Sequence, residues 1–306
     1  MALPSIGLEQ IKDLSRIVAD KVSSSKIKCK RCGIAEHVYN GRPLQNAWID
    51  MGQRKSEIEA PVEVDAKLNT VDMGFDVQSD LHNRLGVFAS YRQGEYELSG
   101  KGRKYYAEKG SEFEIDSWML GVYHRYDQGR IWTMSSIYGG IQDVELTTDT
   151  GVESDSKGMG FGASVEAGVV FEPRKRFTIE PSVRLAYSML KYDDMKDDYG
   201  KRAKFDDINN LEAEVGVKFE RTWLYGKLNM AKLYFKPSII QNMGKGDVCI
   251  KGLPDGDGIK DQTLLRGEVG ASLSMGNGWN GFGFVGHSHG NHYSATDFNL
   301  GLGYSW

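Results

Sequence analysis

Residues 159–172 read MGFGASVEAGVVFE, a stretch in which apolar residues alternate with glycine, serine and glutamate. As an extended chain, it would carry on one face Met159, Phe161, Ala163, Val165, Ala167, Val169 and Phe171. The other face would carry Gly160, Gly162, Ser164, Glu166, Gly168 and Glu172, with Val170 as the exception. A period of two predicts a β-strand with one apolar and one polar face.

The same alternation recurs in FTIEPSVRLAYSMLK (177–191), LEAEVGVKFE (211–220) and LRGEVGASLSM (265–275). Counting similar segments, we expect about twelve strands. Their ranges are 46–54, 64–78, 83–97, 112–126, 130–146, 157–172, 176–192, 205–221, 231–250, 262–275, 279–287 and 296–306. Many exceed the ~5–6 residues common in water-soluble strands and reach the ~9–11 that cross a bilayer at a tilt.

The links between these segments alternate in length. Short links such as SDLHN (79–83), DQG (127–129) and EPRK (172–175) follow every second strand, and 222–230 is a longer exception. Between them lie long charged links such as SGKGRKYYAEKGSE (99–112) and DDMKDDYGKRAK (193–204). Tight turns at one end and long loops at the other are typical of outer-membrane barrels.

Composition excludes several classes of protein. The chain has 306 residues, a formal charge of −4, 37 Gly and 15 Tyr, and no long apolar run. We therefore expect no transmembrane helix, and the absence of a basic tract argues against a nucleic-acid partner. The first residues lack the basic and apolar regions of a signal peptide, which suggests a cytosolic chain or a fragment of a longer exported precursor.

Aromatic residues gather near the ends of the expected strands, where barrels carry interfacial girdles. They are Trp48, Trp132, Trp223, Trp279, Tyr304 and Trp306. The chain ends on the strand pattern DFNLGLGYSW (297–306). An open sheet edge in hydrocarbon would leave unpaired backbone N–H groups, so we expect this last strand to pair with the first, AWIDMGQ (47–53).

Only the N-terminus has a helical pattern. In residues 5–22, apolar residues recur at steps of three and four, and the opposite face carries Glu9, Lys12, Asp13, Arg16 and Asp20. Because this charge is mixed, we expect weak attraction to an anionic lipid surface and a better fit inside a polar lumen. A long linker, 23–45, separates the segment from the first strand, so either 5–22 or 23–45 could fill the pore.

Charged residues lie on the polar faces of the strands, and in a barrel these faces line the lumen. The pore-lining candidates are Asp72, Asp76, Arg84, Arg92, Glu166, Glu180, Arg184, Glu212, Glu214, Lys218, Arg266 and Glu268. In a soluble β-sandwich the same residues would form the solvated face, and only closure distinguishes the two folds. A barrel of about twelve strands leaves a lumen too wide for its own side chains to fill, which implies water, a plug or a threaded chain.

Residues 46–306 resemble the translocator (β) domain of autotransporters, the type V secretion family. The resemblance rests on the helical segment followed by NAWIDMG (46–52), on SWMLGVYHRY (117–126), on the 160–190 hairpin and on the terminal aromatic. It implies a twelve-stranded outer-membrane barrel in a Gram-negative bacterium that anchors and helps to export an N-terminal passenger. It also implies partners, namely lipid, lipopolysaccharide and the barrel assembly machinery, which would read an assembly signal made of Phe298, Leu300, Leu302, Tyr304 and Trp306.

Three local motifs have alternative interpretations. Cys29 and Cys32 form CKRC, which fits a local disulfide or incidental pair, a metal site or a redox site; the metal interpretation lacks a second cysteine pair, since Cys249 stands alone. GHSHGNH (286–292) is expected in an exterior loop, as a weak metal or hydrolase candidate. Asn209–Asn210 resembles the bond at which some autotransporters release their passenger, but it lies far from the first strand, so we expect ordinary turn chemistry.

Together these patterns predict an all-β transmembrane barrel (46–306) preceded by a helix and linker (1–45) that would join it to a passenger. We expect a monomer that translocates its passenger, with no cofactor, no metal and no catalysed reaction. A passive porin-like channel is the main alternative, and a hydrolase with catalytic loop residues is the third. A porin would give no reason for a helix before the first strand and would form trimers.

Overall fold

The computed structural model describes residues 3–24, 38–39, 42–43, 45–59, 63–99, 111–147, 153–193, 195–197, 202–205, 207–225, 229–245, 248–250 and 261–306. Cys29 and Cys32 lie outside these residues.

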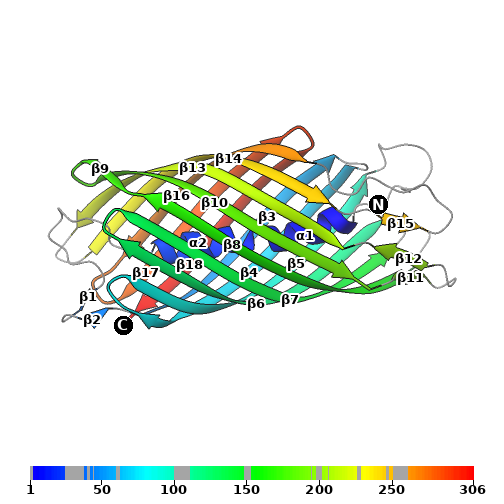
Figure 1. Ribbon diagram of the computed structural model, residues 1–306, viewed down its shortest axis with the longest axis horizontal. Coiled ribbons are helices and arrows are strands. Elements are labelled where there is room, and N and C mark those ends of the chain that lie inside the picture. Colours follow the sequence, from blue (N-terminus) through cyan, green and yellow to red (C-terminus); the bar gives the residue numbers. More distant parts are fainter. Residues whose placement is uncertain are drawn as a thin grey trace.

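Twelve long antiparallel strands close into a barrel (Figure 1). They are β3 (Asn46–Glu59), β4 (Glu63–Ser79), β5 (Asn83–Ser99), β6 (Glu112–Gln128), β7 (Ile131–Thr147), β8 (Glu153–Val169), β10 (Phe177–Tyr192), β13 (Ile208–Tyr225), β14 (Asn229–Lys245), β16 (Gln262–Ser274), β17 (Trp279–Gly290) and β18 (Tyr293–Ser305). Each pairs with its neighbours in the chain, and β18 pairs with β3. The expected all-β transmembrane fold is confirmed.

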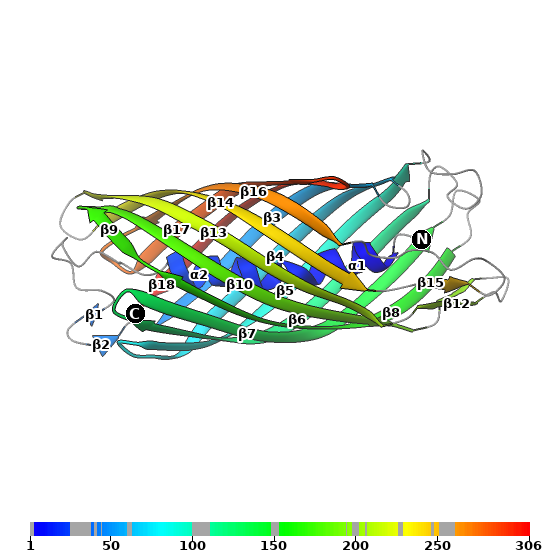
Figure 2. The same cartoon turned by 45° about the horizontal axis from the view of Figure 1, so that its top comes forward.

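Short elements extend the barrel at its two ends. β9 (Phe171–Arg174) lengthens the β8–β10 hairpin, and a small hairpin, β1 (Val38–Tyr39) with β2 (Arg42–Pro43), lies at the same end as the C-terminus (Figures 1 and 2). β11 (Met195–Asp197), β12 (Arg202–Phe205) and β15 (Val248–Ile250) form a ladder at the other end. We call these the tight-turn end and the long-loop end.

The register places apolar side chains outside and polar ones inside. Leu185 pairs with Val165, and the next pair, Arg184 with Glu166, faces the opposite way. Val165 is 50% exposed, whereas Arg184 and Glu166 are buried. An exposed apolar belt around a polar interior is the reverse of the side-chain distribution in a water-soluble protein. This distribution is the one expected for a barrel surrounded by lipid.

The last strand seals the barrel against the first, as predicted. Leu302 pairs with Ile49 and Leu300 with Met51, so both pairs share the outer face. Beyond the ladder, Trp306 and Gln45 exchange backbone hydrogen bonds, each with an N···O distance of 3.1 Å. The terminal residue is therefore held by the same pairing that removes the sheet edge.

The N-terminal segment forms two helices, α1 (Leu3–Lys12) and α2 (Leu14–Ser24), where a single helix over 5–22 was expected. The break lies at Asp13, whose carbonyl accepts from the N–H groups of Arg16 and Ile17 at 3.1 Å. Both helices lie inside the barrel, with the N-terminus at the long-loop end (Figures 1 and 2). No described helix is long and apolar enough to span a membrane.

Two of the expected girdle tryptophans point inward instead. Trp48 and Trp132 are only 4% and 3% exposed, and they lie over Gly74 and Gly168, where a Cβ would come within 2.6 Å of the indole. Both residues share the strand parity of inward neighbours, such as Asp50 for Trp48, and this parity outweighs their position near a strand end. Trp223, Trp279, Tyr304 and Trp306 are exposed, as expected, and so is Trp118.

Several links are shorter than expected because the strands run further. β13 continues to Tyr225 and β14 begins at Asn229, so the supposed long link 222–230 is mostly strand. Likewise β3 ends at Glu59 and β4 begins at Glu63. Asn209 and Asn210 lie within β13 and not in a turn; the Tyr187 hydroxyl donates to Asn209 at 2.5 Å, while Asn210 faces inward and donates to Asn242.

Candidate functional site: the lumen and its helices

One side of the helices packs on an apolar part of the wall. Ile6, Ile11, Leu14 and Val18 are fully buried. Their cluster includes, from β4 to β13, Val64, Tyr96, Ile115, Met119, Tyr138, Leu190 and Ile208. Burying an aliphatic side chain contributes roughly 1.5–3 kcal/mol, so this contact alone gives the helices a defined seat.

Gly7 brings α1 against β10 at the long-loop end. A Cβ at Gly7 would lie 1.8 Å from the hydroxyl oxygen of Tyr192. That hydroxyl donates to Gln142 at 2.8 Å, and the Gln142 amide donates to the Gly7 carbonyl at 3.1 Å. Only glycine allows the helix backbone to come this close to the wall.

Gln10 contacts the wall formed by β5 and β6. Its amide nitrogen donates to the Ile115 carbonyl at 2.9 Å and to the Tyr96 hydroxyl at 3.2 Å. Ser117 donates to the Gln10 side-chain oxygen, and Arg92 donates to its backbone carbonyl at 2.7 Å. Every polar atom of this buried side chain thus has a partner, as burial requires.

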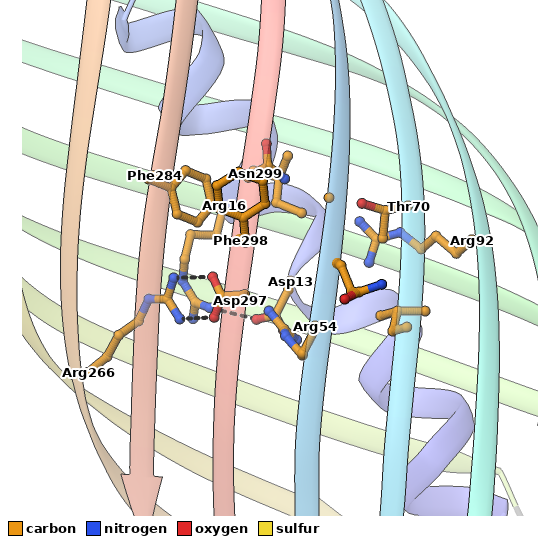
Figure 3. A pocket seen from close by; sticks show the side chains of 14 residues that line it. Asp13, Arg16, Arg54, Thr70, Arg92, Arg266, Phe284, Asp297, Phe298 and Asn299 are labelled. Carbon is orange, nitrogen blue, oxygen red and sulfur yellow. Dashed lines mark hydrogen bonds and ion pairs between the residues drawn. The ribbon is translucent and has the colours of Figure 1, made fainter.

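The second helix makes charged contacts with β10 and β13. Arg16 binds Glu212 at 2.8 Å and Glu214 at 3.0 Å, both on β13, and Asp13 at 2.6 Å. Arg184 of β10 binds the same two glutamates, and its Nη1 donates to Ser15 at 2.7 Å. Lys236 lies 3.4 Å from Glu214 and Arg54 bridges to Asp13. Figure 3 shows Asp13, Arg16 and Arg54 where helix and wall meet.

Lys21 lies toward the tight-turn end, in a cage of oxygens and rings. Its ammonium is 2.5 Å from Asp50 and 2.6 Å from Asn299. The same nitrogen lies 4.2 Å from the ring centre of Phe282 and 5.4 Å from that of Phe284. Carboxylate, amide and aromatic faces all favour a cation, so burial of this lysine is compensated.

The pore-lining candidates lie on the inner face of the wall, and several of them pair with one another. Eleven of the twelve are buried, and the Lys218 side chain is 17% exposed. The pairs are Arg84–Asp76 at 3.4 Å, Arg92–Asp72 at 3.9 Å, Lys218–Glu180 at 3.8 Å, Arg266–Glu268 at 2.8 Å, and Arg184 with Glu212 and Glu214. Three candidates hydrogen-bond to side chains of α2, namely Arg184, Glu212 and Glu214, and two donate to helix carbonyls, namely Arg84 to Val22 and Arg92 to Gln10.

Sequence reasoning omitted inward residues that hold the helices. Asp50, Arg54 and Asn299 contact the helices directly, and Asp297 binds Arg266 at 2.7 Å. Asp50 lies between the outward Ile49 and Met51, and Asp297 and Asn299 flank the outward Phe298; this alternation with apolar residues was the signal that could have found them.

The histidine-rich segment shows no arrangement for hydrolysis or metal binding. β17 runs through His287 and His289, which are exposed outside the barrel, whereas Ser288 faces inward and accepts from Arg266 at 3.1 Å. The expected loop is thus mostly strand, Ser288 lies on the opposite face from His287 and His289, and His292 lies in the turn that follows. Within the described ranges, no group of three His, Cys, Asp or Glu side chains could hold a metal ion.

Comparison with known proteins decides the family. The model of the autotransporter β-domain matches residues 51–286. The chain belongs to the autotransporter β-domain family. Among curated proteins, none matches the chain.

Solved translocator domains share the β-domain's fold. The translocator domain of NalP from Neisseria meningitidis is 17% identical, with a TM-score of 0.73 over 95% of this chain and 92% of that one. The transport unit of AIDA-I from Escherichia coli is 15% identical, with a TM-score of 0.69 over 95% and 98%. The β-domain of the Bordetella autotransporter BrkA is 17% identical, with a TM-score of 0.68 over 85% and 98%.

Family membership confirms the location and the transport role expected from the sequence. The β-domain is an outer-membrane barrel of a Gram-negative bacterium that anchors and helps to translocate an N-terminal passenger. The porin-like alternative has no better support, and the fold is that of a secretion barrel.

Proposed function

We propose that α1 and α2 are the part of the exported chain that stays in the lumen once the passenger has crossed, and that they close the pore. In this division, residues 1–45 connect the passenger to the barrel and residues 46–306 form the translocator. The observation that carries the proposal is the binding of Arg16 to Glu212 and Glu214, because a charged helix residue and a charged wall complete each other only when the helix is inside.

The direction of the helices agrees with export. The N-terminus lies at the long-loop end, which in outer-membrane barrels faces the cell exterior, and α2 lies toward the opposite end (Figure 1). A passenger joined before residue 1 would therefore start outside. The twelve lining candidates would contact the chain while it passes, and a polar wall suits a chain that carries both polar and charged residues.

The remaining roles follow from the same proposal. The β-domain acts as a monomer in lipid and lipopolysaccharide, catalyses no reaction, and is assembled by the outer-membrane barrel machinery, which reads Phe298, Leu300, Leu302, Tyr304 and Trp306. The first four of these side chains are exposed on the outer face of β18, and Trp306, directly after the strand, is exposed as well, so a partner inserting the barrel could contact them.

Ion conductance in planar bilayers tests the plug. We expect the full chain to conduct poorly and a variant lacking residues 1–24 to open a larger and steadier conductance. Gln142→Ala, which removes one wall contact and keeps the helices, is the control and should conduct like the full chain. Equal conductance with and without residues 1–24 would show that the helices do not close the pore, and the porin-like alternative would then be favoured.

A further inference from the structure

The pairing of β3 with β18, which we call the seam, differs from every other strand pairing of the barrel. Every other pairing between two of the twelve long strands joins strands that follow one another among these twelve along the chain, whereas the seam joins the first strand to the last. No covalent link therefore keeps the two strands together if their hydrogen bonds open.

Next to the tight-turn end, where the Ser305 hydroxyl donates to its register partner Asn46 at 3.1 Å, the inner face of the seam has a stretch without direct side-chain pairs. Three successive inward pairs each contain a glycine: Asn299 with Gly52, Gly301 with Asp50, and Gly303 with Trp48. Cross-strand side-chain pairs are a main source of stability between neighbouring strands, so this stretch depends on its backbone ladder and on whatever else fills the lumen.

Lys21 provides the missing contact near the tight-turn end. Asp50 belongs to β3 and Asn299 to β18, and each faces a glycine across the seam. The Lys21 ammonium binds both, at 2.5 Å and 2.6 Å. One helix side chain thus connects the first strand to the last.

Glu9 makes an equivalent connection near the long-loop end. One of its carboxylate oxygens accepts from Ser56 of β3 at 3.1 Å and from Tyr293 of β18 at 2.5 Å. Lys12 lies 4.8 Å from the centre of the Tyr293 ring, so a second helix residue also holds this aromatic.

Between the Lys21 and Glu9 contacts, two register partners of opposite charge face each other across the seam, but each forms its ion pair with a third residue. Arg54 of β3 is paired in register with Asp297 of β18. Arg54 forms an ion pair with Asp13, at the break between the helices. Asp297 accepts bidentate hydrogen bonds from Arg266 of β16 at 2.7 and 2.8 Å (Figure 3). The helix therefore holds β3 here as well.

We propose that the helices fasten the seam from inside through Glu9, Asp13 and Lys21, so that the seam is secure only when they occupy the lumen. While another segment of the chain fills the pore, these contacts are absent and the first and last strands are the easiest part of the wall to separate. The timing of this change rests on the proposed export function, but the dependence of the seam on the helix does not.

Hydrogen exchange measured by mass spectrometry on the folded full chain in detergent tests the inference. In Glu9→Ala combined with Lys21→Met, we expect amides of 47–57 and 294–304 to exchange about tenfold faster, while those of 133–143 and 158–168 change less than about twofold. The matched control is Gln10→Ala, which removes comparable helix contacts to β5 and β6 and should leave the seam unchanged. Equal acceleration of all strands, or none at the seam, would overturn the proposal.

A cross-link provides a second measurement. It can be made in the single variant Lys21→Met, so it remains possible if the combined variant does not fold. Lys55 and Thr296 are register partners across the seam and are exposed on the outside. Cysteines at these positions, joined by a short bismaleimide, should restore slow exchange in Lys21→Met and in the combined variant. Failure of the cross-link to slow exchange would also contradict the proposal. Neither readout involves export or conductance. The experiments can therefore reject pore closure by the helices while supporting their stabilisation of the seam, or the reverse.

Discussion

Arg16 of α2 and Arg184 of β10 bind the same two carboxylates, Glu212 and Glu214 of β13. One guanidinium comes from the helix and the other from the wall, and all four groups are buried. Buried like charges tolerate such proximity only when opposite charges lie between them. The wall thus holds a negative site that is completed by a residue of the lumenal helix.

Loss of Arg16 should destabilise the filled barrel. Arg16→Met keeps the length of the side chain but leaves Glu212 and Glu214 short of one cation, and removing one partner of a buried ion pair costs about 3 kcal/mol. We expect a lower urea midpoint for unfolding, measured by tryptophan fluorescence. Arg16→Lys keeps the charge but lacks the forked geometry of the guanidinium. Its urea midpoint should lie between those of wild type and Arg16→Met. An unchanged midpoint in Arg16→Met would mean that the cluster contributes nothing to stability.

Gly7 is predicted to be intolerant of even one added methyl group. Alanine would favour the helix by ~1 kcal/mol, but its Cβ would overlap the Tyr192 hydroxyl, and such overpacking costs ~1–3 kcal/mol. We therefore expect Gly7→Ala to lower stability. In a double-mutant cycle with Tyr192→Phe, the combined loss should be smaller than the sum of the single losses. Strictly additive losses would show that the two side chains do not meet.

The barrel could be predicted from the sequence because its signal is repeated. A period of two in 159–172 says little alone, but the same pattern in many long segments, with links of alternating length, leaves few other folds. The pairing of 297–306 with the first strand followed from the cost of an open edge. These are rules of the backbone and of the surrounding solvent, and they act on every strand alike.

Details that depend on contacts across the lumen could not be predicted in this way. The helix breaks at Asp13, a residue that binds both Arg16 and Arg54, and nothing in the helical period of 5–22 reveals Arg54 as its partner. The inward Trp48 and Trp132 were misassigned because their position near strand ends was weighed above their parity. Asp50 and Asn299 acquire a role only through Lys21, which reaches them from a distant part of the chain.

The tight turn after β4 should give the β-domain a small acid-sensitive component. The backbone N–H groups of Asn83 and His82 donate to Asp80 at 2.6 and 2.8 Å and hold the pKa of its carboxyl below the usual value. Because the folded pKa is depressed, the stabilisation is present above the unfolded value of about 3.9 and is lost as the pH falls through the folded value.

Asp80→Asn removes this titration while keeping a short polar side chain in the turn. We expect wild type to be more stable than the variant near neutral pH, and the gap to close below about pH 3.9. The measurement is the urea midpoint as a function of pH. A gap that stays constant from neutral to acidic pH would show that Asp80 does not act through its charge.

The lipid-facing surface should reject charge in a depth-dependent way. Val165 lies on the outer apolar belt, and Val165→Arg should cost ~2–4 kcal/mol if it faces the bilayer midplane. Asn69, also outward but on the polar band toward the long-loop end, accepts a hydrogen bond from Gln53 at 2.9 Å. Asn69→Arg should cost ~0–1 kcal/mol in the same refolding equilibrium in lipid vesicles. Equal costs at the two positions would contradict the assignment of the lipid belt.

Trp306 offers a test of whether the end of the chain is read during assembly or only anchors the barrel in the interface. Trp279 is a close control, because it lies at the same end of the barrel and the exposed fractions of the two side chains are 50% and 51%. Both contact Tyr304, whose ring centre is 5.2 Å from that of Trp279 and 6.3 Å from that of Trp306. A girdle role alone would thus make the two residues nearly equivalent.

In cells, we expect Trp306→Ser to lower the heat-modifiable, membrane-inserted fraction about tenfold, and Trp279→Ser about twofold, as loss of one interfacial aromatic implies. Refolding of the purified variants into vesicles, where no assembly machinery is present, should remove the difference. If both variants assemble equally in cells, the terminal aromatic is an anchor and not a signal.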